Sequence, residues 1–200
     1  MPATVQLQTV LLILAGPAGV GKSTLCDRMV AEVPGFERVI TATTRPPRVG
    51  EVNDRDYHFL SEKQFDEKLT AGEFLEWACV HQKYRYGTLK SAVLNRLPVT
   101  SLVMNIDVQG VRTIRAAAKH LPLLQSRLVT VFVAPDSFEV LRERLEYRGK
   151  DSGEEIARRL RTAELELGER SSYDYVIHSG TKEQDFRALR AFWEQAKRKL

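Results

Sequence analysis

One short motif near the N-terminus constrains the fold of this 200-residue chain more than any other feature. It follows the continuous apolar, β-rich run Thr9 to Leu14, and it precedes a helical pattern that places Leu25, Met29 and Val30 on one side. The motif fits the pattern GxxxxGK[ST], and its residues are Gly16, Pro17, Ala18, Gly19, Val20, Gly21, Lys22, Ser23 and Thr24. A strand, a glycine-rich turn and a helix in this order predict a phosphate-binding loop, or P-loop, whose backbone N–H groups surround phosphate.

Each residue type of this loop has a chemical task. Lys22 is expected to reach the β and γ phosphates, and the Ser23 hydroxyl is expected to ligate Mg²⁺. The motif therefore predicts that the whole loop binds ATP, with Mg²⁺ as the cofactor. The alternative is a glycine-rich structural turn with a surface lysine, and the position of the complete motif between a strand and a helix argues against it.

Composition narrows the class of protein. Apolar residues make up 43% and charged residues 28%, which excludes disordered, collagen-like and coiled-coil chains. The net charge of +4, without a block of like charges, favours small anionic ligands over nucleic acid. The run Val10 to Ala15 is too short to span a membrane, so a cytoplasmic protein is expected. Cys26 and Cys79 lack metal-ligand spacing, and both are expected to be small core residues.

Later apolar runs repeat the appearance of a buried strand, and a helix candidate follows each one. This alternation predicts an α/β protein of the P-loop NTPase fold, with a parallel sheet and helices on both faces. The runs are Leu102 to Ile106, Leu128 to Val133 and Tyr175 to Ile177.

Between these elements, short alternating segments predict a small, mostly antiparallel sheet. One helix interrupts it, because Ser61 and Gln64 form a capping-box pattern and Gly72 follows as a stop signal. Arg142 to Arg170 is charged and helical with few apolar anchors, so it is expected to protrude. The segments of the small sheet are Arg38 to Thr43, Tyr57 to Leu60 and Phe74 to Val80.

Several motifs inside and beyond this small sheet resemble the guanylate kinase family, and the resemblance covers nearly the whole chain. It implies transfer of the ATP γ-phosphoryl group to GMP, and also to dGMP, giving ADP and GDP. It also implies a single domain, 1–200, with a core (1–37, 89–141 and 171–200), a GMP-binding subdomain (38–88) and a helical lid (142–170). The motifs are Thr41–Glu51, Asp56–Phe59, Gly72–Ala78, Tyr86–Thr88, Ile106–Gly110 and Arg148–Ser152.

The arginines of the first motif suit a phosphate acceptor. Arg45 and Arg48 flank two prolines, which restrict the backbone and present two guanidinium groups to a dianionic monophosphate. Tyr57 and Tyr86 can add O–H donors to the same phosphate. Without the P-loop, a solvated basic loop and tyrosines packed in a sheet would be the better explanation of these residues; together with the P-loop, a phosphate site is favoured.

Guanine presents N1–H and an amino group as adjacent donors, and Glu76 can accept both. The resemblance adds base contacts from Thr41, Thr88 and Asp107. Taken alone, Glu76 fits a solvated strand residue and Asp107 a helix N-cap. The combination of residues therefore carries the assignment of a GMP site.

Phosphoryl transfer depends on positioning and on charge neutralisation, so no nucleophilic side chain is expected. Lys22 and Arg45 are expected to take part in catalysis, and the resemblance implies that arginines of the lid close over the transferred group. These lid arginines are Arg144, Arg148 and Arg159.

The sequence departs from the family pattern at several positions. Asn105 stands where the family usually has a carboxylate, and Ser179 stands where it usually has an asparagine beside adenine. The segment before Tyr86 is one residue longer than usual, so Arg85 is a second candidate for the phosphate contact.

ATP and GMP are the expected partners, without nucleic acid or membrane, in a monomer or homodimer. One alternative is a catalytically inactive guanylate-kinase-like interaction module. Another is a P-loop kinase for a different small phosphorylated acceptor.

Overall fold

The computed structural model describes residues 9–80, 83–147 and 153–197 of the chain. Its centre is a five-stranded sheet in which every pairing is parallel, which confirms the expected α/β class. In spatial order the strands are β2 (Phe36–Arg38), β7 (Ser101–Asn105), β1 (Leu11–Ala15), β8 (Leu128–Pro135) and β9 (Tyr175–Ser179).

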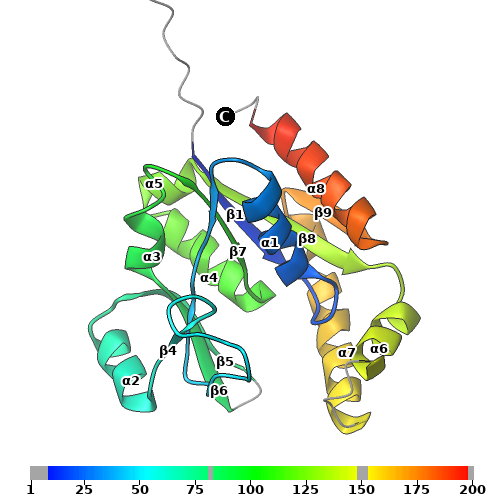
Figure 1. Ribbon diagram of the computed structural model, residues 1–200, viewed down its shortest axis with the longest axis horizontal. Helices are drawn as coiled ribbons and strands as arrows, with labels where there is room; N and C mark the ends of the chain where they lie inside the picture. Colours follow the sequence, from blue (N-terminus) through cyan, green and yellow to red (C-terminus); the bar gives the residue numbers. More distant parts are fainter. Residues whose placement is uncertain (1–8, 81–82, 148–152, 198–200) are drawn as a thin grey trace, which may run out of the picture.

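Helices cover both faces of this sheet because its central strand is apolar on both sides (Figure 1). Leu12 and Leu14 of β1 pack into the cluster that includes α1 (Lys22–Glu32) and α8 (Lys182–Ala196). Leu11 and Ile13 point the other way, where the cluster includes α3 (Lys90–Leu94), α4 (Val108–Ala118) and α5 (Pro122–Gln125).

A second, four-stranded sheet contains β4 (His58–Phe59), β3 (Ala42–Thr43), β6 (Tyr84–Leu89) and β5 (Phe74–Val80) in that order. The β3–β4 pairing is parallel and the other two pairings are antiparallel, as the sequence indicated. Two details were not expected. The segment from Arg38 to Thr43 is divided, because Arg38 belongs to β2 of the large sheet, and β6 is an additional strand.

Helix α2 (Glu62–Thr70) covers the small sheet, and the Phe65 ring stacks on the Phe74 ring at 4.4 Å. The capping box of Ser61 and Gln64 is present, and Gly72 follows the helix with a φ of +67°. Both expected boundary signals of this helix are therefore confirmed.

Helices α6 (Phe138–Tyr147) and α7 (Gly153–Leu167) pack against each other, and the short 3-10 helix η1 (Arg170–Ser172) follows. In Figure 1 this pair and the small sheet lie on opposite sides of the same end of the large sheet. Within the segment Arg142 to Arg170, Leu145 and Ala163 are buried in the core cluster that also includes residues of α1 and α8, and Ile156 and Leu160 pack against it.

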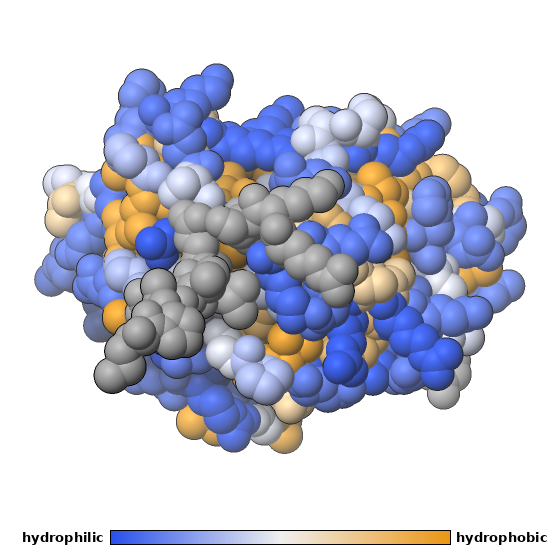
Figure 2. All heavy atoms as spheres, turned by 90° about the horizontal axis from the view of Figure 1, so that it is seen from above, coloured by the Kyte–Doolittle hydropathy of each residue, from blue (hydrophilic) through white to orange (hydrophobic). Residues whose placement is uncertain are grey.

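Figure 2 shows the molecule from above, and on this face hydrophilic side chains dominate while apolar ones form small separate patches. Within the described ranges, no helix is both long and apolar enough to cross a membrane.

Candidate active site

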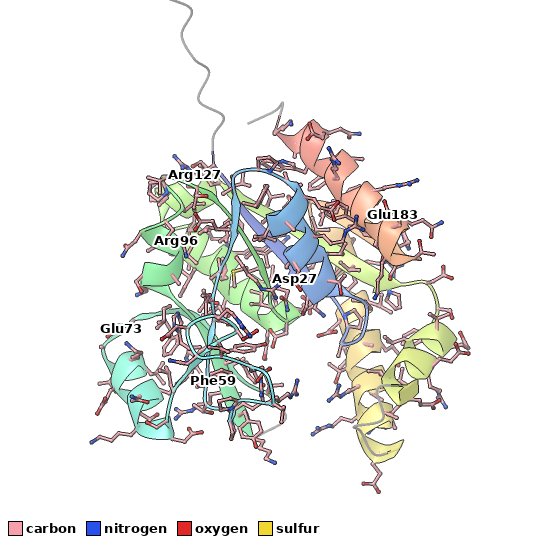
Figure 3. The ribbon with its side chains drawn as sticks, in the orientation of Figure 1. Asp27, Phe59, Glu73, Arg96, Arg127 and Glu183 are labelled. Carbon is pink, nitrogen blue, oxygen red and sulfur yellow. The ribbon has the colours of Figure 1, made fainter. Side chains whose placement is uncertain are left out.

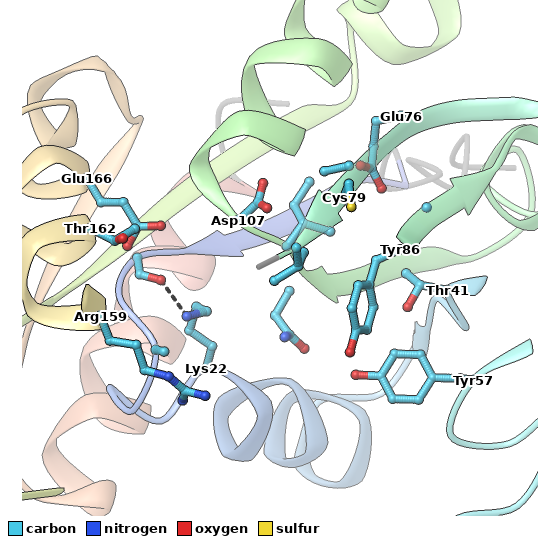
Figure 4. A pocket seen from close by; sticks show the side chains of 17 residues that line it. Lys22, Thr41, Tyr57, Glu76, Cys79, Tyr86, Asp107, Arg159, Thr162 and Glu166 are labelled. Atoms are coloured by element: carbon cyan, nitrogen blue, oxygen red, sulfur yellow. Dashed lines mark hydrogen bonds between the residues drawn. The ribbon is translucent and has the colours of Figure 1, made fainter. Parts of the chain in front are cut away.

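The P-loop begins where β1 ends, and its first residue has to be glycine. Gly16 has a φ of +129°, and a Cβ atom there would lie 2.3 Å from the carbonyl oxygen of Val133. Lys22 is the first residue of α1, and its ammonium group donates to the carbonyl oxygens of Gly16 (2.5 Å) and Pro17 (2.8 Å) (Figure 4). Val20 is buried and anchors the loop to the core.

A cavity of about 200 Å³ lies against this loop at the N-terminus of α1. The helix terminus presents backbone N–H groups and a partial positive charge, which suit an anion. The lining residues are Ala18, Gly19, Gly21, Lys22, Ser23, Thr24 and Asn105.

The residues of this cavity fit a magnesium ion that arrives with a nucleotide. Ser23 is exposed there, and a hydroxyl oxygen is a hard donor of the kind that Mg²⁺ accepts beside phosphate oxygens and water. Across residues 9–80, 83–147 and 153–197, no three His, Cys, Asp or Glu side chains gather in a cluster that could hold a metal ion without such help.

A larger cavity of about 540 Å³ opens beside the P-loop (Figure 4). Its wall comes from segments far apart in the chain, including the P-loop, the strands of the small sheet, the end of β7 and α7. The lining residues are Gly16, Ala18, Lys22, Thr41, Tyr57, Glu76, Ala78, Cys79, Val80, Tyr86, Gly87, Asn105, Ile106, Asp107, Arg159, Thr162 and Glu166. The fold thus brings together residues from both predicted nucleotide sites.

Glu76 is the buried acid of this cavity. Its side chain lies on β5, and its Oε1 accepts a 2.5 Å hydrogen bond from the Thr88 hydroxyl on β6. Burial raises the pKa of Glu76 to about 7, and the nearby Asp107 adds to the rise, while the Thr88 hydrogen bonds oppose it. The structure places Thr88 behind Glu76, fully buried, and not on the cavity wall.

Asp107 lines the cavity and also caps α4. Its Oδ1 accepts a hydrogen bond from the Gly110 N–H at 2.7 Å. The expectation of a helix cap is therefore confirmed, and the same side chain faces the cavity.

Two tyrosine hydroxyls point toward one region of the cavity in Figure 4. Tyr57 and Tyr86 have ring centroids 6.1 Å apart, and burial raises the pKa of Tyr57. Arg45 donates to the Tyr86 hydroxyl at 3.2 Å and pairs with Glu51 at 2.9 Å. Burial lowers the pKa of Arg45, but the bonds to Glu51 and Tyr86 outweigh it and leave that pKa raised.

Arg45 and Arg48 lie outside the group of described residues that line the cavity. Glu51 holds both ends of their loop, because its second carboxylate oxygen accepts the backbone N–H of Arg48 at 2.7 Å. The Arg48 side chain is exposed.

Strand alternation decides between Tyr86 and Arg85. Tyr86 faces the cavity, whereas Arg85 faces α2, where it pairs with Glu62 and with Asp66 and lies over the Phe65 ring at 4.6 Å. The structure thus turns Arg85 away from the cavity.

One face of α7 forms the wall opposite the small sheet. Arg159, Thr162 and Glu166 line it, at spacings that place them on one side of a helix. Burial raises the pKa of Glu166, and the charge of Lys22 opposes that rise. Of the other predicted lid residues, Arg144 lies on α6 but its side chain is outside the described part of the structure, and Arg148 lies outside the described residues.

Sequence reasoning missed Thr162 and Glu166, although their helical spacing from Arg159 could have indicated them. It placed Cys79 in the core, and that expectation is wrong: Cys79 is exposed. The reason is that β5 is an edge strand, and the small core beneath that sheet, Ala42, Phe65, Phe74 and Leu89, ends before this residue.

Ser179, which stands where the family usually has an asparagine, is buried. Its hydroxyl donates to Asp185 Oδ2 at 2.9 Å, so it supports the end of β9 from inside the protein.

Known proteins share this architecture. A guanylate kinase from Anaplasma phagocytophilum superposes with a TM-score of 0.72 at 23% identity, covering 96% of this chain and 88% of that one. A shikimate kinase from Bacteroides thetaiotaomicron gives a TM-score of 0.52 at 16% identity, covering 94% of this chain and 98% of that one. These likenesses concern the fold.

Sequence relatives are more specific. A guanylate kinase from Gloeobacter violaceus is 44% identical over 168 residues, which are 84% of this chain and 78% of that protein. One from Rhodopseudomonas palustris is 38% identical over 197 residues, covering 97% of this chain and 86% of the relative. A model of the guanylate kinase family matches residues 8–196. The chain therefore belongs to the guanylate kinase family.

Proposed function

We propose that this chain transfers the γ-phosphoryl group of ATP to GMP in the cavity between the P-loop and the small sheet. The observation that carries this proposal is that Lys22 and Glu76, the centres of the two predicted nucleotide sites, line one cavity. A donor phosphate on the loop and an acceptor phosphate in the cavity would then meet with water largely excluded.

The base of GMP is assigned to the end of the cavity formed by Glu76 and Asp107. The ionised Glu76 carboxylate accepts from guanine N1–H and from its amino group, and Thr88 holds Oε1 in place. Adenine lacks this pair of donors, and binding it would leave a buried carboxylate unpaired. Selectivity of roughly 10⁴-fold is expected from such a site. Thr41, on the same wall, is the further base contact.

The acceptor phosphate is assigned to the place where the hydroxyls of Tyr57 and Tyr86 converge. Arg45 supplies positive charge through Tyr86, and Arg48 is exposed beside it and can swing toward the same phosphate. The Arg45 and Glu51 pair fixes the loop beforehand, which lowers the entropy lost on binding.

The donor side is assigned to the P-loop. In the described structure the Lys22 ammonium lies on two carbonyl oxygens of its own loop, and it would exchange them for the β and γ phosphates of ATP. Ser23 would hold Mg²⁺, which neutralises phosphate charge when bound.

Arginines of the segment 142–170 are assigned to the transferred group. Arg159 already lies on the cavity wall opposite the small sheet. Arg144 and Arg148 are proposed to join it when this lid closes, which excludes water and limits wasteful hydrolysis of ATP.

The remaining proposals concern the range of acceptors, the domain organisation and the cellular role of the protein. The contacts proposed for the acceptor reach its base and its phosphate, so dGMP, which lacks only the ribose 2′-hydroxyl, is the expected second acceptor. We assign residues 38–88 to the acceptor subdomain within a single domain. We further propose a monomeric or homodimeric cytoplasmic enzyme of purine nucleotide metabolism that binds no nucleic acid.

The test is ADP formation from MgATP by the purified protein. GMP and dGMP serve as acceptors, with AMP, CMP and no acceptor as controls. ADP that appears only with the guanine nucleotides supports the proposal. Binding of GMP without ADP formation would instead indicate the interaction module, and turnover with AMP would show that Glu76 does not select the base.

A further inference from the structure

Asn105, the last residue of β7, borders both cavities. It lies on the wall of the 540 Å³ acceptor cavity and also on the wall of the 200 Å³ cavity at the P-loop. If the two nucleotides occupy these spaces as proposed above, Asn105 stands where their phosphates meet. In place of the carboxylate that the family usually has at this point, Asn105 offers an uncharged amide that can donate hydrogen bonds.

Arg38, the last residue of the neighbouring strand β2, is fixed beside it. Its guanidinium donates to Asn105 Oδ1 at 2.8 Å and to the Ser23 carbonyl oxygen at 3.3 Å, and it also pairs with the Asp27 carboxylate. Asp27 projects from α1, the helix that begins at the P-loop (Figure 3). Three groups from α1 and β7 therefore hold the guanidinium in one place.

This anchor decides which way the Asn105 amide points. An arginine side chain has only donors, so the atom that faces Arg38 has to be the amide oxygen. The amide nitrogen is then turned away from Arg38. Among the residues that the structure describes, none accepts a hydrogen bond from Asn105 Nδ2, and both of its N–H groups are available to a ligand.

We propose that Asn105 Nδ2 donates to phosphate oxygens at the junction of ATP and GMP, and that Arg38 is the positioning residue that keeps the amide in this orientation. The inference rests on the proposed function. A fixed donor aimed at oxygens that gain charge during transfer stabilises the transition state without reorganising. The interaction is therefore expected to affect kcat more than the KM of either nucleotide.

The experiment measures kcat and KM for ADP formation in Asn105→Ala, Asn105→Asp, Arg38→Met and the double variant Asn105→Ala/Arg38→Met. Removing the donor in Asn105→Ala is expected to lower kcat roughly 10²-fold. Arg38→Met is expected to lower kcat roughly tenfold, because the amide can then rotate. The double variant is expected to match Asn105→Ala within about twofold, since Arg38 acts only through Asn105.

Arg28→Met is the matched control. Arg28 lies on the same helix as Asp27 and also holds acidic partners, Glu32 and Glu183, but it does not line either cavity. Its loss should change thermal stability and leave kcat unchanged.

Three results would overturn the inference. They are an unchanged kcat in Arg38→Met, losses that multiply in the double variant, and an Asn105→Asp variant that keeps full kcat at a lower Mg²⁺ requirement, which would mean a role on the metal. The two Asn105 variants retain Arg38, so they test the donor even if Arg38→Met folds poorly. A wild-type protein that forms no ADP with GMP would instead refute the proposed function.

Discussion

The candidate active site has a donor half, which is the P-loop, and an acceptor half, which is the part around Glu76 and Asp107, and the two are built in different ways. The P-loop is one contiguous segment whose binding groups are mainly backbone, and its shape depends on Gly16, where a Cβ atom would collide with Val133. The acceptor half consists of side chains brought together from β5, β6 and the start of α4. A backbone site tolerates variation of most side chains around it, whereas a side-chain site depends on strand register and on buried partners.

The halves also differ in the core that supports them. Val20, Leu25 and Met29 anchor the P-loop and its helix in the large hydrophobic cluster of the main sheet. Among the described residues, the buried core of the small sheet is the smaller cluster of Ala42, Phe65, Phe74 and Leu89, against which Leu60, Leu69 and Ala92 pack. Since less apolar area is buried there, the acceptor half is the part expected to open at lower free energy.

The strongest test of the comparison removes the positively charged side chain of the donor half, Lys22. Lys22→Ala is expected to lower kcat by roughly 10³-fold or more, because the charge on the β and γ phosphates is no longer neutralised. GMP binding, measured by calorimetry, should change less than about threefold, since other residues hold the acceptor. Lys63→Ala, which removes an exposed lysine of α2, is the control. Normal turnover by the Lys22 variant would contradict the donor assignment.

The acceptor half is tested by Glu76→Gln. The amide cannot accept both guanine donors, so the ratio of kcat/KM for GMP over AMP is expected to fall roughly 10²-fold. KM for ATP should stay the same. Glu73→Gln changes an exposed glutamate just before β5 and should leave the ratio intact (Figure 3). If both variants behave alike, Glu76 is not the base-reading residue.

The pKa of Glu76, about 7, gives the acceptor half a pH dependence. GMP binding needs the carboxylate, so affinity should rise roughly tenfold from pH 6 to pH 8. The GMP phosphate also titrates near pH 6. The Glu76→Gln variant keeps the pH dependence that comes from the GMP phosphate and loses the part that comes from Glu76. Equal pH profiles of GMP binding in the variant and the wild-type protein would therefore count against Glu76 as the group that contacts guanine.

The same raised pKa affects stability, with a definite sign. The pKa of Glu76 is about 7 in the folded protein and 4.5 in the unfolded chain, so between pH 4.5 and pH 7 the folded protein binds more protons than the unfolded chain. Stability from protonated Glu76 is therefore full below 4.5 and is lost as the pH rises through 7. The free energy of unfolding should fall by roughly 3 kcal/mol across this range relative to Glu76→Gln.

The smallest effect is expected from Gly110→Ala on α4. Its Cβ atom would lie 3.1 Å from Glu76 Oε2 and 3.0 Å from Ile106 Cδ1. KM for GMP should rise about threefold, while Tm is retained or raised because alanine favours a helix by about 1 kcal/mol. Ala116→Gly on the exposed side of the same helix should do the reverse, lowering Tm with KM unchanged. Parallel changes in Tm and KM would assign the effect of Gly110 to helix stability.

The sequence predicted those features that depend on neighbouring residues. The P-loop, the capping box of Ser61 and Gln64 and the parallel strands are all local patterns, and the structure contains them. Glu76 and Asp107 lie 31 positions apart, and nothing local to either residue distinguishes it from an ordinary strand residue or helix cap. They were predicted together only through a family resemblance.

By itself, then, the sequence determined the α/β class and the phosphate-binding loop, because strand period, glycine spacing and helix caps act over a few residues. The candidate residues of the acceptor site came from the resemblance to a family. Tertiary structure alone decided that Thr88 supports Glu76, that Tyr86 and not Arg85 faces the cavity, and that Arg38 orients Asn105. These pairings join different strands, and strand order and register arise only when the whole hydrophobic core is packed.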